Sequence, residues 1–259
     1  PVGGEAEHAA LVTELALAAA PDARVAVRVH PVDHPHFDAD VAHIAGRAGH
    51  RLVHMMVPKV ETVQDVERAA RALDAAGAPQ LPLQVLIESP AAVHRAFDIA
   101  AHPRVQSLSF GLMDFVSAHG GAIPSEGMGV QGQFSHPLVV RAKLEIASAC
   151  HAHGKVPSHC VVTEFSDPQA MRQSALRASR ELGYTRMWSI HPAQIRPILE
   201  AMAPSASSTH HMRGSRGFIF GLPSRPGLRW ANSDPCDAHV QAAARKTGNW
   251  RGRATDRRG

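Results

Sequence analysis

Two acidic residues stand where a pair of carboxylates could share one metal ion. Glu88 closes the apolar segment 84–87, and Asp114 follows the next apolar segment along the chain. If these segments are neighbouring parallel strands, both side chains project from the same edge of the sheet. Carboxylates completed by water and substrate oxygens suit Mg²⁺, which prefers hard oxygen ligands and keeps some of its water. We therefore predict a Mg²⁺ site at Glu88 and Asp114; the alternative is that each acid only supports a turn.

Basic side chains occupy comparable positions. Arg28 interrupts an apolar segment, where burying its charge is costly unless it is paired. A guanidinium there can bind a substrate carboxylate, and the alternative is a structural ion pair. Lys59 follows Val57-Pro58 and is a second candidate for substrate binding, or a solvated charge. His191 precedes the last predicted helix, and because helix N-termini attract anions, we predict that it contributes to cofactor binding.

Other reactive residues form no comparable pattern. The 18 histidines contain no HExxH spacing, and the three cysteines form no CxxC pair. We interpret Cys160, inside a predicted strand, as a core residue rather than a nucleophile. Unpaired thiols predict a reducing, cytoplasmic location. No run of 18 apolar residues occurs, which excludes a transmembrane helix.

The elements that must position these residues alternate along the chain. Short β-branched or apolar segments predict strands, and longer segments with helical spacing, several closed by Gly or Pro, predict helices. The predicted strands are 24–29, 52–57, 83–87, 105–110, 156–162 and 186–190. The predicted helices are 5–20, 38–48, 63–76, 91–101, 137–153, 168–182 and 192–202. A long loop over 123–134 is a candidate lid.

This alternation leaves two architectures, an open doubly wound sheet or a (β/α)8 barrel. No GxGxxG or GxxxxGK[ST] motif follows a predicted strand, so a nucleotide-binding fold has no support. Polar and charged residues instead gather where strands end, which is where barrel enzymes place their chemistry. We predict an α/β fold, a (β/α)8 TIM barrel that lacks its first two strands.

Composition divides the chain near residue 204. Residues 205–259 hold ten basic and three acidic residues, a net charge of +7, whereas the rest holds 17 basic and 20 acidic residues, a net charge of −3. We predict a partial barrel domain over 1–204 and an irregular basic tail over 205–259, either disordered or translated out of frame. Trp230 and Trp250 in this tail would suit a nucleic-acid arm, but we rank that function last.

Six short motifs occur in an order that resembles the HpcH/HpaI aldolase and citrate lyase β-subunit family. The resemblance is nearest to the citrate lyase β-like branch, which includes citramalyl-CoA and malyl-CoA lyases, and it runs from about residue 3 to 204. The motifs are Val27-Arg28-Val29-His30-Pro31, Val57-Pro58-Lys59-Val60-Glu61, Leu86-Ile87-Glu88-Ser89-Pro90, His102-Pro103-Arg104-Val105, Phe110-Gly111-Leu112-Met113-Asp114-Phe115 and Ile190-His191-Pro192-Ala193-Gln194-Ile195.

The resemblance implies a barrel of the phosphoenolpyruvate/pyruvate-binding type, assembled as a trimer or hexamer. It implies Mg²⁺ on Glu88 and Asp114, a substrate carboxylate on Arg28, and substrate contacts at Lys59 and Gly111. The chain departs from the family pattern where two leading strands and a C-terminal lid are expected. It also has His30 where the family often has Asn, and Tyr184-Thr185-Arg186 where Gly-Lys is usual.

We therefore expect a Mg²⁺-dependent carbon–carbon lyase. It would cleave a 3-hydroxyacyl-CoA, such as a citramalyl-, malyl- or citryl-CoA, into a 2-oxo acid and an acyl-CoA. One alternative is a CoA-independent aldolase acting on a 2-oxo acid such as pyruvate. The other is an inactive, incomplete member of the family.

Overall fold

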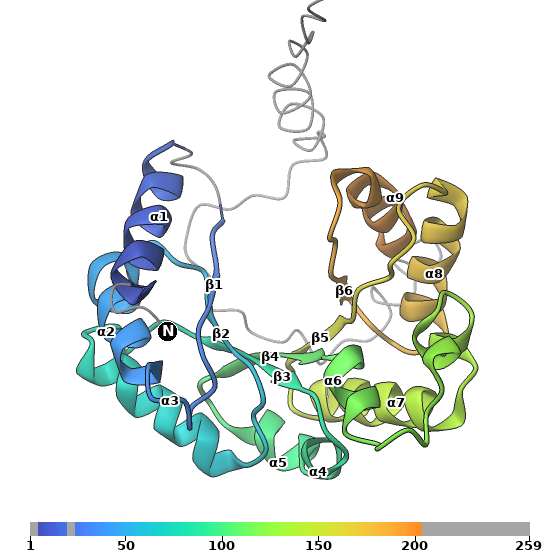
Figure 1. The fold of residues 1–259 in the computed structure, drawn as a ribbon, viewed down its shortest axis with the longest axis horizontal. Helices are drawn as coiled ribbons and strands as arrows, with labels where there is room; N and C mark the ends of the chain where they lie inside the picture. The colour runs from blue at the N-terminus through green and yellow to red at the C-terminus, as the bar shows by residue number, and fades with distance from the viewer. Residues whose placement is uncertain (1–4, 20–23, 204–259) are drawn as a thin grey trace, which may run out of the picture. The chain divides into compact units, whose positions relative to one another are not determined.

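A computed structural model gives the arrangement of residues 5–19 and 24–203, which are the residues that the structure describes (Figure 1). All of them belong to the first of two units of the chain, Pro1–Ser215. The tail that we predict over 205–259 lies outside the described residues.

The described residues form a parallel sheet whose strands follow one another in chain order. The register aligns Arg28 with Met56, Met56 with Gln84, and Ser158 with Arg186. Within the described ranges the first and last strands each have one neighbour, so the sheet is open at both edges. The strands are β1 (Val27–Arg28), β2 (Met55–Val57), β3 (Leu83–Ile87), β4 (Val105–Phe110), β5 (Val156–His159) and β6 (Arg186–Met187).

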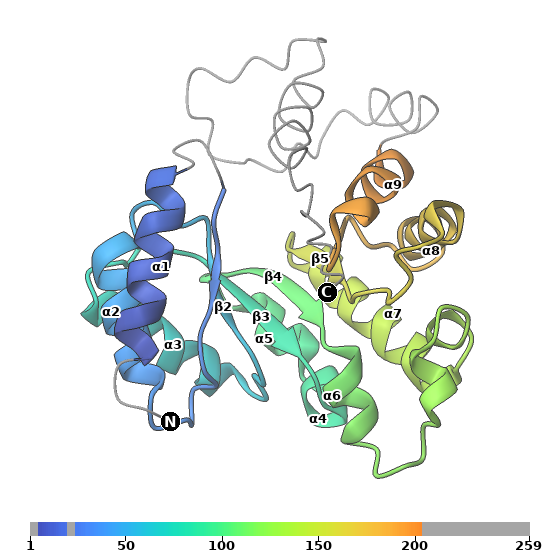
Figure 2. The ribbon, with the colours of Figure 1, turned by 45° about the horizontal axis from the view of Figure 1, so that its top comes forward.

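The helices cover the convex side of this curved sheet, as Figures 1 and 2 show. The six strands and the alternation with helices confirm the α/β prediction, while closure into an eight-stranded barrel is not seen in the described residues. The helices are α1 (Glu5–Ala19), α2 (Phe37–Ala48), α3 (Val63–Ala75), α4 (Pro90–His94), α5 (Ala96–Ala101), α6 (Leu112–Ser117), α7 (Pro137–Ala152), α8 (Pro168–Arg180) and α9 (Pro192–Met202), with 3₁₀ turns η1 (Ser125–Met128) and η2 (Gly132–Phe134).

Several predicted elements differ from the structure. Helix α6 was not predicted, and four strands are shorter than predicted, those over 24–29, 52–57, 156–162 and 186–190. The helix predicted over 91–101 is divided at Arg95, whose φ of −98° and ψ of 9° interrupt the helical backbone. The strand predicted over 24–29 contains only two residues of regular ladder, although backbone bonds from Val53 to Val25 and from Val29 to Met56 extend the pairing in both directions. An edge strand has ladder partners on one side only, so its regular part is short.

The core lies between the sheet and the helices. Every residue of β2 and β3 is buried, as their nearly unbroken apolar sequences require. Val57, Val85 and Ile87 have no exposed surface, and each such aliphatic side chain contributes about 1.5–3 kcal/mol by leaving water. The strands whose ends carry the predicted site are therefore anchored in the hydrophobic core.

None of the helices in the described part of the chain is long and apolar enough to cross a membrane.

Candidate active site

Glu88 lies directly after β3 and is the most enclosed acid of the predicted site. The residue is 7% exposed, and its Oε2 accepts a hydrogen bond of 2.7 Å from the backbone N–H of Lys59. The next residue, Ser89, caps α4 by accepting from the N–H of Ala92 and donates to Glu61 Oε2. The Glu88 carboxylate is thus held by the loops that follow two neighbouring strands.

Gly111 makes room for this carboxylate. It follows β4 beside Glu88, and its N–H donates to the carbonyl of Ile87 at 3.0 Å. A Cβ at position 111 would overlap Cγ and Oε1 of Glu88. The glycine is therefore a steric requirement of the site, and its role in substrate binding stays a prediction.

Lys59 links the two predicted metal ligands. Its backbone N–H binds Glu88, and its Nζ lies 3.7 Å from Asp114 Oδ1. Its φ of 52° makes it the one non-glycine residue with a left-handed backbone among the described residues. Such a conformation costs roughly 1–3 kcal/mol and is typical of functional sites. Asp114, in the first turn of α6, has a half-exposed side chain, which leaves its oxygens open to water.

Arg28 differs from the expectation drawn from its apolar neighbours. The sequence predicts a buried charge, but the residue is exposed, because Val27 and Val29 face the core and Arg28 faces the opposite, concave side of the sheet. It makes no ion pair within the described residues. Its positive charge acts on Glu88, where it lowers the pKa of the carboxyl.

The charges of Asp114, Lys59 and Arg28 all act on the pKa of the Glu88 carboxyl. Burial raises the pKa of its carboxyl above the ordinary value, and the charge of Asp114 raises it further. The hydrogen bond and charge of Lys59 and the charge of Arg28 oppose that rise in pKa. Two carboxylates that destabilise each other are stabilised by a cation between them.

A Mg²⁺ ion fits this donor set. Glu88 offers an enclosed carboxylate, Asp114 offers an open one, and the exposed side of Asp114 leaves room for water ligands. Within the described residues, no group of three or more His, Cys, Asp or Glu side chains could hold a metal.

His191 serves as the N-cap of α9. Its Nδ1 accepts from the N–H of Ala193 at 3.2 Å, and its ring lies against that of Phe165. No contact in the described residues joins His191 to Glu88 or Asp114, so its role in cofactor binding stays a prediction.

Sequence reasoning missed a polar network on the concave face. Gln84 donates to Ser109 Oγ at 2.6 Å, Trp188 donates to the same oxygen at 3.1 Å, and Arg186 donates to Gln84 Oε1 at 3.4 Å. The signal was present, because Gln84 and Ser109 are polar residues inside apolar strands. The network lines the side of the sheet that holds the candidate site.

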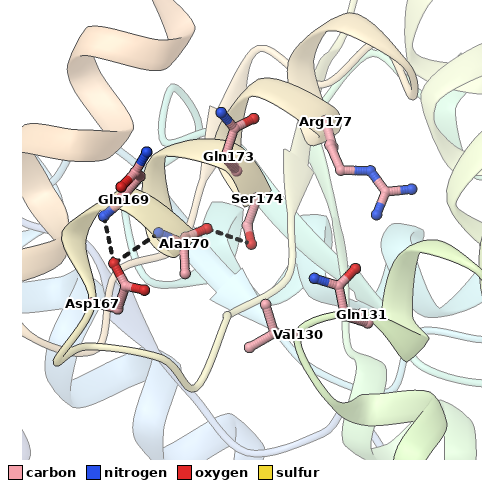
Figure 3. Close-up of a pocket in the computed structure, with 8 residues that line it drawn as sticks. All are labelled: Val130, Gln131, Asp167, Gln169, Ala170, Gln173, Ser174 and Arg177. Carbon is pink, nitrogen blue, oxygen red and sulfur yellow. Dashed lines mark hydrogen bonds between the residues drawn. The ribbon is translucent and has the colours of Figure 1, made fainter.

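A separate polar pocket lies beside the start of α8 (Figure 3). It has a volume of about 300 Å³ and is lined by Val130, Gln131, Asp167, Gln169, Ala170, Gln173, Ser174 and Arg177. Asp167 accepts from the backbone N–H groups of Gln169 and Ala170 and so caps α8 itself. None of the predicted site residues lines this pocket, which is therefore distinct from the candidate active site.

Comparison with known proteins identifies the class. The sequence matches the HpcH/HpaI aldolase/citrate lyase family over residues 6–192, and the chain belongs to that family. It is 30% identical over 203 residues to the L-malyl-CoA/beta-methylmalyl-CoA lyase of Rhodobacter capsulatus, which covers 73% of this chain and 64% of the relative. It is 29% identical over 197 residues to the citrate lyase subunit beta-like protein of Deinococcus radiodurans, covering 76% of this chain and 64% of that relative.

Solved structures agree with this assignment. A citrate lyase from Burkholderia xenovorans LB400 superposes with a TM-score of 0.74 at 42% identity, covering 96% of this chain and 82% of that one. The citrate lyase beta subunit of Mycobacterium tuberculosis, complexed with oxaloacetate and magnesium, shares the fold with a TM-score of 0.58 at 21% identity, covering 74% of this chain and 80% of that one. The chain spans about 64% of the length of the curated relatives.

Proposed function

We propose that this chain forms the catalytic part of a Mg²⁺-dependent carbon–carbon lyase that cleaves a 3-hydroxyacyl-CoA into a 2-oxo acid and an acyl-CoA. The observation that carries the proposal is the meeting of Glu88, Asp114, Lys59 and Arg28 at one edge of the sheet. The lyase names of the relatives support it, and a related structure described as containing magnesium, acetoacetate and coenzyme A supports the cofactor and substrate class.

The site residues suggest how the reaction would proceed. Glu88 and Asp114 would hold Mg²⁺, which supplies positive charge next to the oxygens of the substrate. Arg28 would bind the carboxylate beside the substrate hydroxyl, and the ammonium of Lys59 would balance the charge of Asp114. The hydroxyl proton leaves to a base, the bond between C2 and C3 breaks, and the thioester enolate takes up a proton to give the acyl-CoA. Arg28 would stabilise the negative charge at the reacting end.

We also propose the domain structure, the oligomeric state and the location of the protein. Residues 1–204 would form a partial (β/α)8 barrel domain, and the protein would act as a homo-oligomer, a trimer or hexamer, in the cytoplasm. The buried, free thiols of Cys150 and Cys160 agree with a reducing compartment. We propose neither a nucleic-acid nor a membrane partner.

Cleavage of CoA and CoA-free substrates by the purified full chain tests the function. We expect Mg²⁺-dependent release of a 2-oxo acid from malyl-CoA or citramalyl-CoA. Glu88→Gln and Asp114→Asn should each lower kcat/KM by about 100-fold or more, because each removes a charge that holds the metal. Asp98→Asn, an exposed acid on α5, is the matched control and should keep activity.

Two results would contradict the proposed function and favour one of the alternatives. Cleavage of free 2-oxo acid adducts but not of thioesters would favour the CoA-independent aldolase. A thermal unfolding midpoint that does not respond to Mg²⁺, together with no cleavage of any substrate, would show that the chain is an inactive member of the family.

A further inference from the structure

Trp188 directly follows β6, and its side chain reaches across the concave side of the sheet. Leu108 and Phe110 of β4 pack into the hydrophobic core, so Ser109 between them faces the concave side. The indole Nε1 of Trp188 donates a hydrogen bond of 3.1 Å to Ser109 Oγ. A residue at the end of β6 therefore contacts β4, although β5 lies between these strands in the sheet.

The polar residues that Trp188 reaches are enclosed although they face the concave side. Ser109 has no exposed surface, and Gln84 of β3, which donates to Ser109 Oγ at 2.6 Å, is 3% exposed. Arg186 of β6 reaches the same pair of residues, because its guanidinium donates to Gln84 Oε1 at 3.4 Å. Trp188 and Arg186 thus lie over the middle of the sheet, and Trp188 itself stays partly exposed.

The register of the sheet places Trp188 at the level of the candidate active site. One set of residues is aligned from β3 to β6, namely Leu86, Ser109, Ser158 and Arg186. Glu88, Gly111 and Trp188 each follow a member of this set by two residues, so they share one level at the carboxyl edge of the sheet. Backbone bonds from Gly111 to β3 and from Trp188 to β5 continue the pairing to this level. Gly111 in turn lies against the carboxylate of Glu88.

The substrate of the proposed reaction has one group left to meet this indole. The carbon that bears the hydroxyl also carries a carboxylate, the thioester arm and a fourth substituent. The hydroxyl and the carboxylate would face Glu88, Asp114 and Arg28. The thioester arm has to leave through the open edge of the sheet, because CoA is far larger than a side chain on its concave side. The fourth substituent is then directed toward the concave side, where Trp188 lies.

We propose that Trp188 contacts this fourth substituent and determines which substituents the site accepts. The inference rests on the proposed function and names the substrate class within it. The bond to Ser109 holds the indole in place, and the face of the ring is apolar. Trp188 therefore favours a hydrogen or a methyl group, as in malyl-CoA and citramalyl-CoA. It disfavours the carboxymethyl group of citryl-CoA, because that charge would lose its water against the ring.

Cleavage of citramalyl-CoA and citryl-CoA by the full chain with Mg²⁺ tests the proposal. We expect the parent to have the higher kcat/KM for citramalyl-CoA. Trp188→Ala should lower this preference by about 10-fold or more, because it removes the apolar surface and opens space above Arg186. Trp188→Phe keeps an aromatic ring and should keep most of the preference. Phe97→Ala, which removes an exposed ring from α5, is the matched control and should leave the preference unchanged.

A binding measurement keeps the test decisive if Trp188→Ala folds poorly. The chain has three tryptophans, so Trp230→Phe combined with Trp250→Phe leaves Trp188 as the only source of indole fluorescence. We expect pyruvate with Mg²⁺ to change the emission of this double variant. The change should saturate at the pyruvate concentration at which calorimetry shows binding to be complete.

The outcomes separate this inference from the proposed function. A parent that prefers citryl-CoA, equal losses for both thioesters in Trp188→Ala, or pyruvate binding without a change in emission would each overturn the role of Trp188 and leave the lyase activity standing. If the parent cleaves neither thioester, the proposed function fails, and the emission measured with pyruvate still decides whether Trp188 borders the bound acid. A parent that binds no 2-oxo acid in the presence of Mg²⁺ would overturn both.

Discussion

At the scale of single residues, the candidate site depends on how closely its neighbours approach Glu88. The carboxylate is enclosed on one side by the backbone of Lys59 and on the other by Gly111. Lys59 contributes its main-chain N–H to Glu88 and its side chain to Asp114, so one residue with an unusual backbone touches both predicted ligands.

Gly111→Ala should displace the Glu88 carboxylate. The added Cβ overlaps Glu88, so we expect a loss of about 1–3 kcal/mol of stability and a smaller rise in the unfolding midpoint on adding Mg²⁺. Gly46→Ala is the matched control, because its Cβ would meet only the carbonyl of Ala76 at 3.8 Å. An unchanged Mg²⁺ response in Gly111→Ala would contradict the close approach.

Lys143→Met should change how stability depends on pH. Burial lowers the pKa of the Lys143 ammonium from 10.5 to about 8. Between these pH values the unfolded chain binds a proton that the folded chain has lost, so the Lys143 contribution to the free energy of unfolding rises with pH. Relative to Lys143→Met, the parent should gain up to about 3 kcal/mol from pH 8 to 10.5. Denaturant titrations that show a constant difference across this range would contradict the shift.

At the scale of elements, the turn between β2 and α3 carries the site residue Lys59 and is held by the N-terminus of α3. Thr62 and Asp65 form a capping box at the start of α3, and Asp65 Oδ2 also accepts from the N–H of Glu61. Glu61 in turn accepts from Ser89, which follows Glu88. The cap therefore fixes the loop that carries Lys59.

Thr62→Ala should cost about 1 kcal/mol of stability, because it removes the acceptor for the Asp65 N–H. Denaturant unfolding measures this loss directly. Thr163→Ala, at an exposed position outside any helix or strand, should change stability by less than about 0.5 kcal/mol. Equal effects of the two substitutions would show that the cap contributes nothing particular.

At the scale of the whole molecule, burial keeps two histidines neutral. Burial, with Arg186 and Arg24 beside it, lowers the pKa of His54 to about 4. Burial also lowers the pKa of His159 well below its usual value, with the charge of Lys143 adding to the effect. The folded chain therefore resists protonation that the unfolded chain accepts.

Acidification should destabilise the protein through these groups. As the pH falls from 6.5 toward 4, the unfolded chain binds protons first, so the free energy of unfolding decreases. His54→Gln should lose less stability over this range than the parent in chloride buffer. His8→Gln, an exposed position on α1, should follow the parent. Parallel losses in all three proteins would exclude His54 as a source of the acid sensitivity.

The fold class could be predicted from the sequence. Unbroken apolar segments that alternate with amphipathic ones are typical of buried parallel strands covered by helices. β4 and α9 have the bounds that the sequence predicts, and the family resemblance drawn from six motifs is confirmed. The approach of Glu88, Lys59 and Asp114 was also predictable, since neighbouring parallel strands end at the same edge.

Other features depend on which side chains meet in three dimensions. The helix break at Arg95 occurs without a Gly or Pro at that position. Arg28 lies between apolar residues in the sequence, yet its side chain is on the exposed face of the sheet. Lys143 looks like a surface residue of α7, yet it is fully buried and its ammonium donates to the carbonyl of Gln133 in η2. The sequence by itself determined the elements and the edge that gathers the carboxylates, because periodicity and strand order are local. Only the tertiary structure decided which charges are buried and which converge, because burial depends on residues far apart in the chain.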